Sequence, residues 1–414
     1  MKFVFCYILV QILCVSSRIE KTDLDSPENI SLWRNFRSLL SQFNSRPGRK
    51  EQILQDARNA QRVQNRIPDS VPFPCDIRGG RSKIVPNSVH KLRPGDIDVV
   101  ASLGDSLTAG FGAFATQLMG LFIESRGVSA TGGGQGNWRE FLTVPNILKE
   151  FNPNLIGYAV SDSYSFQQNA QFNIAVSGAQ SGDIPFMTER LIERITNDSR
   201  VDVEKDWKMI SLMIGNNDFC SDMCYLPSPW LILKNHREDL LDALRTIRDN
   251  LPRTLVNIIP PPHLKILFDI KNKPPICDIT VDFECSCIFG LRWRHQLAEF
   301  YEIMTSYQFM EEEIARYPEF QKNDFAVVVQ PFTTHLTFPI AKDGNFDLSY
   351  LSADCFHISQ KANARSANAI WNNMLLPPHR KIRNWGELFA DFACPTSKRP
   401  YIATMLNSGK ATWN

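Results

Sequence analysis

The sequence has no excess of charge of either sign. Its 414 residues include 45 Lys and Arg against 44 Asp and Glu, which gives a formal net charge of +1. This balance excludes the strongly basic surface that nucleic acid binding requires, so we expect no nucleic-acid partner. Long apolar runs are missing too, because the run from Phe3 to Val15 is too short to span a bilayer as a stable helix. The residues from Leu406 to Asn414 are polar, which argues against a C-terminal membrane anchor.

The N-terminal segment has the pattern of a secretory signal. Lys2 precedes the apolar run, and the small residues Val-Ser-Ser at 15–17 suit cleavage, so a signal peptide is predicted over residues 1–17. A signal anchor is the alternative interpretation. We therefore expect a secreted protein, extracellular or luminal, that is a monomer and has no obligate protein partner.

Cysteine usage agrees with secretion. Two of the ten cysteines, Cys6 and Cys14, lie in the predicted signal peptide, and eight remain. An even number in an oxidising compartment predicts up to four disulfides, although the sequence does not choose among the pairings. A zinc site is the alternative, but the C-x-C and C-x-x-x-C spacings differ from those of common zinc ligands. The eight are Cys75, Cys220, Cys224, Cys277, Cys285, Cys287, Cys355 and Cys394.

Two triplets, which begin at Asn29 and Asn197, match the acceptor sequence for N-linked sugar. The polar surroundings of Asn197 favour a surface position. Both asparagines are therefore predicted glycosylation sites.

Changes in amino-acid composition divide the rest of the chain into an extension, a main domain and a tail. Residues 18–72 have helix-like apolar spacing and end in a proline-rich stretch, so they are interpreted as an N-terminal helical extension and linker. The main domain is expected over residues 73–410, and residues 411–414 form a short tail. With 43% hydrophobic residues, the chain has ample material for a core.

Short apolar runs alternate with helical patterns through the main domain, which predicts an α/β fold, a parallel sheet with helices on both faces. We expect a three-layer α/β/α sandwich with a mostly parallel sheet of five strands. The strands are predicted at 97–103, 172–177, 208–214, 255–259 and 325–330, and helices at 184–195, 238–250, 293–316 and 361–374. Sites in such sheets lie at the carboxyl ends of the strands.

Ser106 is the candidate nucleophile. The uncharged run Val99 to Leu103 predicts a buried strand, and Gly104 ends it in a turn. Ser106 then begins a helix, so its hydroxyl and nearby backbone N–H groups face the edge of the sheet. Asp105 is expected to shape this turn rather than to take part in chemistry.

Asp354 and His357 supply the acid and base that a nucleophilic serine needs. Their spacing lets the carboxylate accept from one ring nitrogen while the other nitrogen faces Ser106. Cys355 lies between them, and we hypothesise that its disulfide pins this loop. His335 is the nearest competitor for the base, and His263 is expected to be structural.

Two further strand ends carry donors for a developing oxyanion. Gly178 offers a backbone N–H and Asn217 a side-chain amide, so the predicted oxyanion hole consists of these groups and the N–H of Ser106. Asp218 is expected only to cap the following helix.

These residues, Gly104-Asp105-Ser106-Leu107 with Gly178, Asn217 and Asp354-x-x-His357, resemble the Gly-Asp-Ser-Leu hydrolases, also called the Ser-Gly-Asn-His superfamily. Longer stretches resemble its phospholipase B branch, from about Phe73 to about Ser408. They are 103–110, 142–148, 214–220, 354–359 and 371–374. The resemblance implies a flavodoxin-like fold and hydrolysis of fatty-acyl esters of glycerophospholipids and lysophospholipids in membranes or micelles.

The expected reaction is ester hydrolysis through an acyl-enzyme, which requires no metal and no organic cofactor. The motif around Ser106 is not the Gly-x-Ser-x-Gly elbow of α/β-hydrolases. Alternatives are an esterase for acetyl or other small acyl esters, and a catalytically silent secreted lipid-binding protein. Apolar residues between Gly110 and Gly136 either line an acyl channel or form a core-facing helix, and the Gly132–Gly134 run is expected to be a flexible turn.

Overall fold

A computed structural model describes residues 49–409 of the chain. The predicted signal peptide, most of the predicted extension, the acceptor Asn29 and the predicted tail at 411–414 lie outside the described residues.

Four parallel strands form the central sheet, in the spatial order β1-β2-β3-β4. They are β1 (Ile97–Gly104), β2 (Trp207–Met213), β3 (Thr254–Ile258) and β4 (Phe325–Val329). Their side chains are buried almost throughout, as expected for strands covered on both faces. The register aligns Ser102 with Ser211 and Ser211 with Asn257, so the carboxyl ends of the strands meet at one edge.

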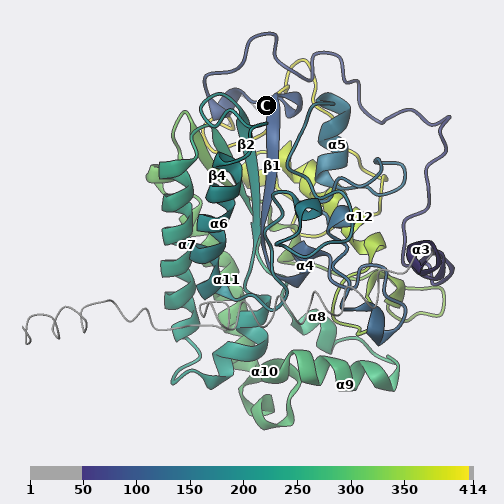
Figure 1. Ribbon diagram of the computed structural model, residues 1–414. Coiled ribbons are helices and arrows are strands. Elements are labelled where there is room, and N and C mark those ends of the chain that lie inside the picture. Colours follow the sequence, from purple (N-terminus) through teal and green to yellow (C-terminus); the bar gives the residue numbers. More distant parts are fainter. Residues whose placement is uncertain (1–48, 410–414) are drawn as a thin grey trace, which may run out of the picture.

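Helices cover both faces of this sheet (Figure 1). On one side lie α6 (Ile184–Thr196), α7 (Leu231–Asn250) and α11 (Leu297–Ile314), and on the other α5 (Val144–Phe151) and α12 (Gln360–Met374). The predicted α/β class and the three layers are confirmed.

The prediction of five strands is wrong by one. The segment predicted as a strand at 172–177 runs beside β1 but forms a single parallel bridge, between Asn173 and Ser102. Three backbone hydrogen bonds join it to β1, and it then turns away at Gly178, where φ is +87°. The ladder is therefore too short to make a strand.

The segment from Gly110 to Gly136 contains no α-helix, so the expectation of a core-facing helix is wrong. It runs through turns and two 3-10 helices, Leu118–Gly120 and Arg126–Val128. The glycine run at 132–134 is buried, and a Cβ on Gly134 would lie 2.1 Å from the Tyr158 ring. Close packing, rather than flexibility, accounts for these glycines.

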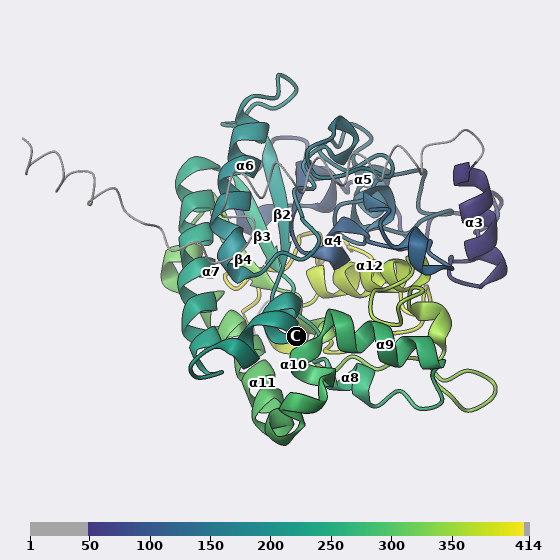
Figure 2. The ribbon, with the colours of Figure 1, turned by 60° about the horizontal axis from the view of Figure 1, so that its bottom comes forward.

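Three helices between β3 and β4 gather near the carboxyl ends of the strands, together with α4 (Ser106–Ala109) (Figure 2). They are α8 (Lys265–Phe268), α9 (Pro275–Glu284) and α10 (Ser286–Phe289). The helix α3 (Arg49–Asn59) buries Ala57 in a small second core with Phe114 and Phe141.

All eight cysteines predicted to remain are in disulfides, which confirms the expected bonding and overturns the zinc alternative. The pairs are Cys75–Cys394, Cys220–Cys285, Cys224–Cys287 and Cys277–Cys355. Three of the four bind α9 and α10 to neighbouring loops. Among the described residues, no helix combines the length and apolar character needed to cross a bilayer.

Candidate active site

Ser106 occupies the first position of α4, directly after the buried strand β1. Gly104 makes this turn possible: its φ is +152°, and a Cβ there would lie 2.4 Å from the backbone oxygen of Met213. Asp105 caps α4, because its carboxylate accepts the N–H of Leu107 at 2.9 Å. The second carboxylate oxygen of Asp105 accepts from the Asn216 amide at 2.8 Å, which ties the turn to the end of β2.

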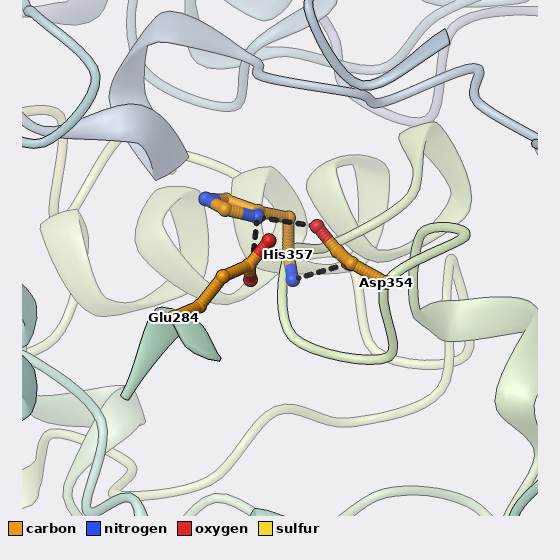
Figure 3. A group of neighbouring side chains, drawn as sticks. All are labelled: Glu284, Asp354 and His357. Atoms are coloured by element: carbon orange, nitrogen blue, oxygen red, sulfur yellow. Dashed lines mark hydrogen bonds and ion pairs between the residues drawn. The ribbon is translucent and has the colours of Figure 1, made fainter. Parts of the chain in front are cut away.

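The structure brings Ser106, His357 and Asp354 into one hydrogen-bonded chain. The Nε2 atom of His357 lies 2.8 Å from the hydroxyl oxygen of Ser106, and its Nδ1 lies 2.7 Å from Asp354 Oδ2. The other Asp354 oxygen accepts the backbone N–H groups of Phe356 and His357, each at 3.0 Å. Acid and base therefore share one tight turn, and Figure 3 shows the Asp354 carboxylate facing both the Nδ1 atom and the backbone N–H of His357.

The Cys277–Cys355 disulfide anchors this turn to α9, in agreement with the hypothesis drawn from the sequence. Cys355 itself adopts a φ of +61°, which is uncommon for a residue other than glycine. This left-handed residue lets the chain reverse between Asp354 and His357, so that the two side chains meet.

Burial and charge act in opposite directions on this pair. Burial alone would lower the pKa of His357, but the Asp354 carboxylate outweighs it and raises that pKa to about 8. For Asp354, burial would raise the pKa, but the His357 imidazolium and the two backbone donors hold it below its usual value. The acid is thus kept ionised beside a strongly basic imidazole.

Gly178 and Asn217 lie in adjacent loops at the same sheet edge. The Asn217 amide donates to the backbone oxygen of Ala179 at 2.8 Å, and the loop before Gly178 is bonded to Gly104 through the N–H of Val176 at 3.0 Å. Neither the Ser106 N–H nor the Gly178 N–H donates to a protein acceptor within residues 49–409. Gly178 itself is exposed, and a Cβ there would meet nothing within 4 Å.

Asp218 does not cap a helix, contrary to the expectation. Both of its carboxylate oxygens accept the backbone N–H of Ser181 at 3.1 Å. It therefore joins the loop after Gly178 to the loop after β2. Burial raises the pKa of Asp218 to about 7, against the opposing hydrogen bonds from Ser181.

The competing histidines lie apart from this chain. His335 is exposed, and its backbone N–H donates to the oxygen of Arg383. The ring of His263 donates to the backbone oxygen of Tyr301 at 3.1 Å, as expected for a structural histidine. The predicted acceptor Asn197 is exposed at the end of α6, beside a surface cavity of about 970 Å³.

Two further residues contact the acid–base pair: Phe111, which belongs to the apolar segment predicted beside the nucleophile, and Glu284, which sequence reasoning missed. The Phe111 ring lies 4.7 Å from the His357 ring, and a Glu284 oxygen lies 3.7 Å from His357 Nδ1 (Figure 3). Glu284, Asp354 and His357 hold ligand atoms within 4.8 Å of one another, the geometry of a candidate metal site. Because Asp354 already engages the Nδ1 atom, an acid–base pair accounts for this cluster more simply than a metal does.

Comparison with known families identifies the chain. The sequence model described as "GDSL-like Lipase/Acylhydrolase" matches residues 100–370, most of the main domain. The chain belongs to the GDSL-like lipase/acylhydrolase family. With that membership it is a carboxylic ester hydrolase, and the matched range contains all five residues of the predicted site.

Within this family the chain is similar to proteins named "Phospholipase B1, membrane-associated". The human protein is 36% identical over 330 residues, which are 79% of this chain and 22% of that protein. The mouse protein is 35% identical over 341 residues, which are 80% of this chain and 23% of that protein. The chain thus matches under a quarter of the length of these relatives.

Among solved structures, an extracellular lipase of Streptomyces rimosus shares 14% identity with a TM-score of 0.34. The similarity covers 66% of this GDSL hydrolase and 98% of the bacterial chain. A score this low supports no structural comparison.

Proposed function

We propose that this GDSL hydrolase cleaves fatty-acyl esters of glycerophospholipids and lysophospholipids, with Ser106 as nucleophile. The observation that carries the proposal is the hydrogen-bonded chain from Ser106 through His357 to Asp354. A serine with its hydroxyl 2.8 Å from a buried, carboxylate-paired imidazole is the arrangement that acyl transfer requires.

In the first step, Ser106 Oγ bonds to the ester carbonyl carbon while His357 Nε2 takes the hydroxyl proton. The tetrahedral intermediate collapses, the ester C–O bond breaks, and His357 returns that proton to the departing alcohol. Water then attacks the acyl-enzyme by the same route and releases the fatty acid. Asp354 keeps the Nδ1–H tautomer and stabilises the imidazolium between these transfers.

The proposed oxyanion hole consists of the Ser106 and Gly178 N–H groups and the Asn217 side chain. One Asn217 amide hydrogen is engaged by Ala179, which orients the group, and the amide has a second hydrogen to donate. Loss of one such donor typically costs about 3–4 kcal/mol of transition-state stabilisation.

Apolar side chains on both sides of the site favour a lipid substrate. On α9, Ile276, Ile279 and Phe283 form an exposed face, with Phe283 89% exposed. Across the site, Met119 is 69% exposed, and Phe122 contacts Phe111, which contacts His357. Exposed apolar groups on both sides of a buried nucleophile suit a substrate presented at a membrane or micelle surface.

The remaining assignments follow the same proposal. Four disulfides fit an oxidising compartment, so we place the protein outside the cell or in a luminal compartment, as the residues 1–17 signal predicts. Asn197, exposed on the surface, is the proposed sugar acceptor within the described residues.

The test compares two substrates. Phosphatidylcholine labelled differently at its two acyl positions is offered in micelles, beside a soluble short-chain ester, to the wild type and to Phe283→Ser. We expect Phe283→Ser to lose several-fold activity on micelles and none on the soluble ester. Phe309→Ser, an exposed phenylalanine on α11, is the matched control and should change neither. Activity of the wild type on acetyl esters alone would reject the phospholipid substrate.

A further inference from the structure

The helix α9 has two chemically different sides. On the inner side, Cys277 bonds to Cys355, and the Thr280 hydroxyl donates to the backbone oxygen of Asp354 at 2.6 Å. Glu284, the last residue of α9, places Oε2 3.7 Å from His357 Nδ1. Positions 277, 280 and 284 fall on one face of a helix. That face holds the turn that carries the predicted acid and base.

Glu284 is fixed in place. The next residue, Cys285, is bonded to Cys220, in the helical turn that follows Asn217, so α9 is covalently held at both ends. The Oε2 atom of Glu284 is buried and has no hydrogen-bond partner within the described residues. A carboxylate oxygen held without a donor is costly to bury, and the cost falls when the carboxyl is protonated or when the adjacent imidazole becomes charged.

We propose that Glu284 is a second acidic partner of His357, a positioning residue that stabilises the imidazolium formed when Ser106 is deprotonated. The hydrogen on His357 Nδ1 is donated to Asp354 Oδ2, with 2.7 Å between the nitrogen and the oxygen. Glu284 therefore acts on the same nitrogen through its charge and not through a hydrogen bond. The inference rests on the proposed acyl-enzyme mechanism, in which that imidazolium forms twice per turnover.

The charged groups around this pair agree with that role. Glu284 faces His357 and Asp354, the Asp105 carboxylate also acts on His357, and the Arg62 guanidinium acts on Asp354. Burial raises the pKa of Glu284 to about 7, the Asp354 charge adds to the rise, and His357 opposes it. Glu284 therefore changes its charge near neutral pH, and it ionises more readily as His357 becomes positive.

The sign of the expected effect follows from the charge. The Glu284 carboxylate raises the pKa of His357. Removing the charge in Glu284→Gln lowers that pKa, so the base is neutral at lower pH. The acidic limb of kcat/KM should therefore move to lower pH, by about half a unit to one unit. At the same time kcat at the plateau should fall about tenfold with KM unchanged, which corresponds to about 1.4 kcal/mol of transition-state stabilisation.

The matched control is Asp282→Asn, which removes a carboxylate from an exposed position of the same helix. It should leave both the pH limb and kcat at wild-type values. Glu284→Asp keeps the charge but shortens the side chain, so its pH limb should lie between wild type and Glu284→Gln. If Glu284→Gln folds poorly, Glu284→Asp provides the test instead. The inference is rejected if Glu284→Asp has both the acidic limb of kcat/KM and the kcat of the wild type.

The two proposals fail in different ways. If the wild type hydrolyses no ester and Ser106 is not labelled by a fluorophosphonate probe, the proposed function itself is wrong. If the wild type is active and Glu284→Gln matches Asp282→Asn in kcat and pH limb, only the role of Glu284 is wrong. The rate of probe labelling against pH gives a second readout, because labelling requires the activated serine but no alcohol leaving group.

Discussion

The molecule contains two Ser–His–acid chains, one at the sheet edge and one in the interior. In the interior, the Ser181 hydroxyl lies 2.8 Å from His236 Nδ1, and His236 Nε2 lies 3.0 Å from Glu311 Oε1. These distances match those of the Ser106–His357–Asp354 chain within 0.3 Å. Residue types and spacing alone would give both chains the same chemistry.

The two chains differ in the direction in which the pKa of the histidine is shifted. The His357 pKa is raised to about 8, whereas burial lowers the pKa of His236 to about 3. Burial also raises the pKa of Glu311 well above its usual value, which disfavours its ionised form. The Ser181 hydroxyl is shared with the hydroxyl of Tyr307, whose ring stacks on His236 at 3.9 Å.

The acid explains the difference. Against the effect of burial, the charge and hydrogen bond of His357 hold the pKa of Asp354 below its usual value, and two backbone N–H groups from its own turn add to this effect. Glu311, on α11, has one oxygen bonded to His236 and the other without a partner in the described part of the chain. The two chains thus share residue types and distances but differ in the surroundings of the carboxylate, which has two backbone donors at Asp354 and an oxygen without a partner at Glu311.

The largest difference in activity is expected between substitutions of the two serines. Ser106→Ala is expected to reduce kcat on the order of 10⁶-fold, to the limit of detection, because it removes the nucleophile. Ser181→Ala should stay within about tenfold of wild type and instead lower the free energy of unfolding by about 1–3 kcal/mol, because it leaves buried partners unpaired. Ester hydrolysis and denaturant unfolding of both variants measure this. Equal activity losses would show that the interior chain also serves catalysis.

Substitutions of the two acids should differ almost as much in their effect on kcat. Asp354→Asn is expected to cost on the order of 10³–10⁴-fold in kcat, since an amide favours the wrong imidazole tautomer. Glu311→Gln puts an uncharged isostere, away from Ser106, in place of a carboxyl whose ionised form is disfavoured, so activity should change less than about twofold. Steady-state kinetics of the two variants decide the matter, and a large loss in Glu311→Gln would mean that Glu311 is ionised.

The pH profile sharpens the contrast further. His357 must be neutral to accept the Ser106 proton, and its pKa of about 8 lies above the usual value. We therefore expect kcat/KM to rise about tenfold per pH unit from pH 6 and to level off above about pH 8. His236 titrates far below this range. Ser181→Ala should accordingly keep the wild-type pH profile. A shift of the acidic limb in that variant would show that the two Ser–His–acid chains are coupled.

The smallest effect concerns the disulfides. Replacing Cys277 and Cys355 by serine should lower the free energy of unfolding by about 2–5 kcal/mol and also reduce kcat several-fold, because the acid–base turn is released. Replacing Cys75 and Cys394, which close a 319-residue separation elsewhere, should cost similar stability but no kcat. Thermal unfolding and kcat at 20 °C test this. Unchanged kcat in the first variant would show that Cys355 does not pin the turn.

The sequence was sufficient for the features that depend on local pattern. The four strands were predicted to within one residue at either end because each is an apolar run buried on both faces. Ser106, Asp354 and His357 could be grouped because parallel strands deliver their carboxyl ends to one edge. The Asp354-x-x-His357 spacing already implied a shared turn.

Features that depend on tertiary packing were out of reach. Eight cysteines allow 105 pairings, so the position of α9 against the Asp354–His357 turn had no signal in the sequence. Nothing in the sequence consequently indicated that Glu284 lies beside His357. The interior chain was missed for the same reason, because Ser181, His236 and Glu311 come from three distant elements that meet only in the folded core.

The two sides of α9 also set how tolerant this helix is to changes of length. Each residue turns an α-helix by about 100°, so a single insertion between Cys277 and Phe283 would rotate one end relative to the other. Phe283, now in solvent, would swing toward the histidine, and the carboxylate would swing out. The number of residues in α9 is therefore a stricter requirement than their identity on the outer face, and natural variants of this helix should substitute freely but neither gain nor lose a residue.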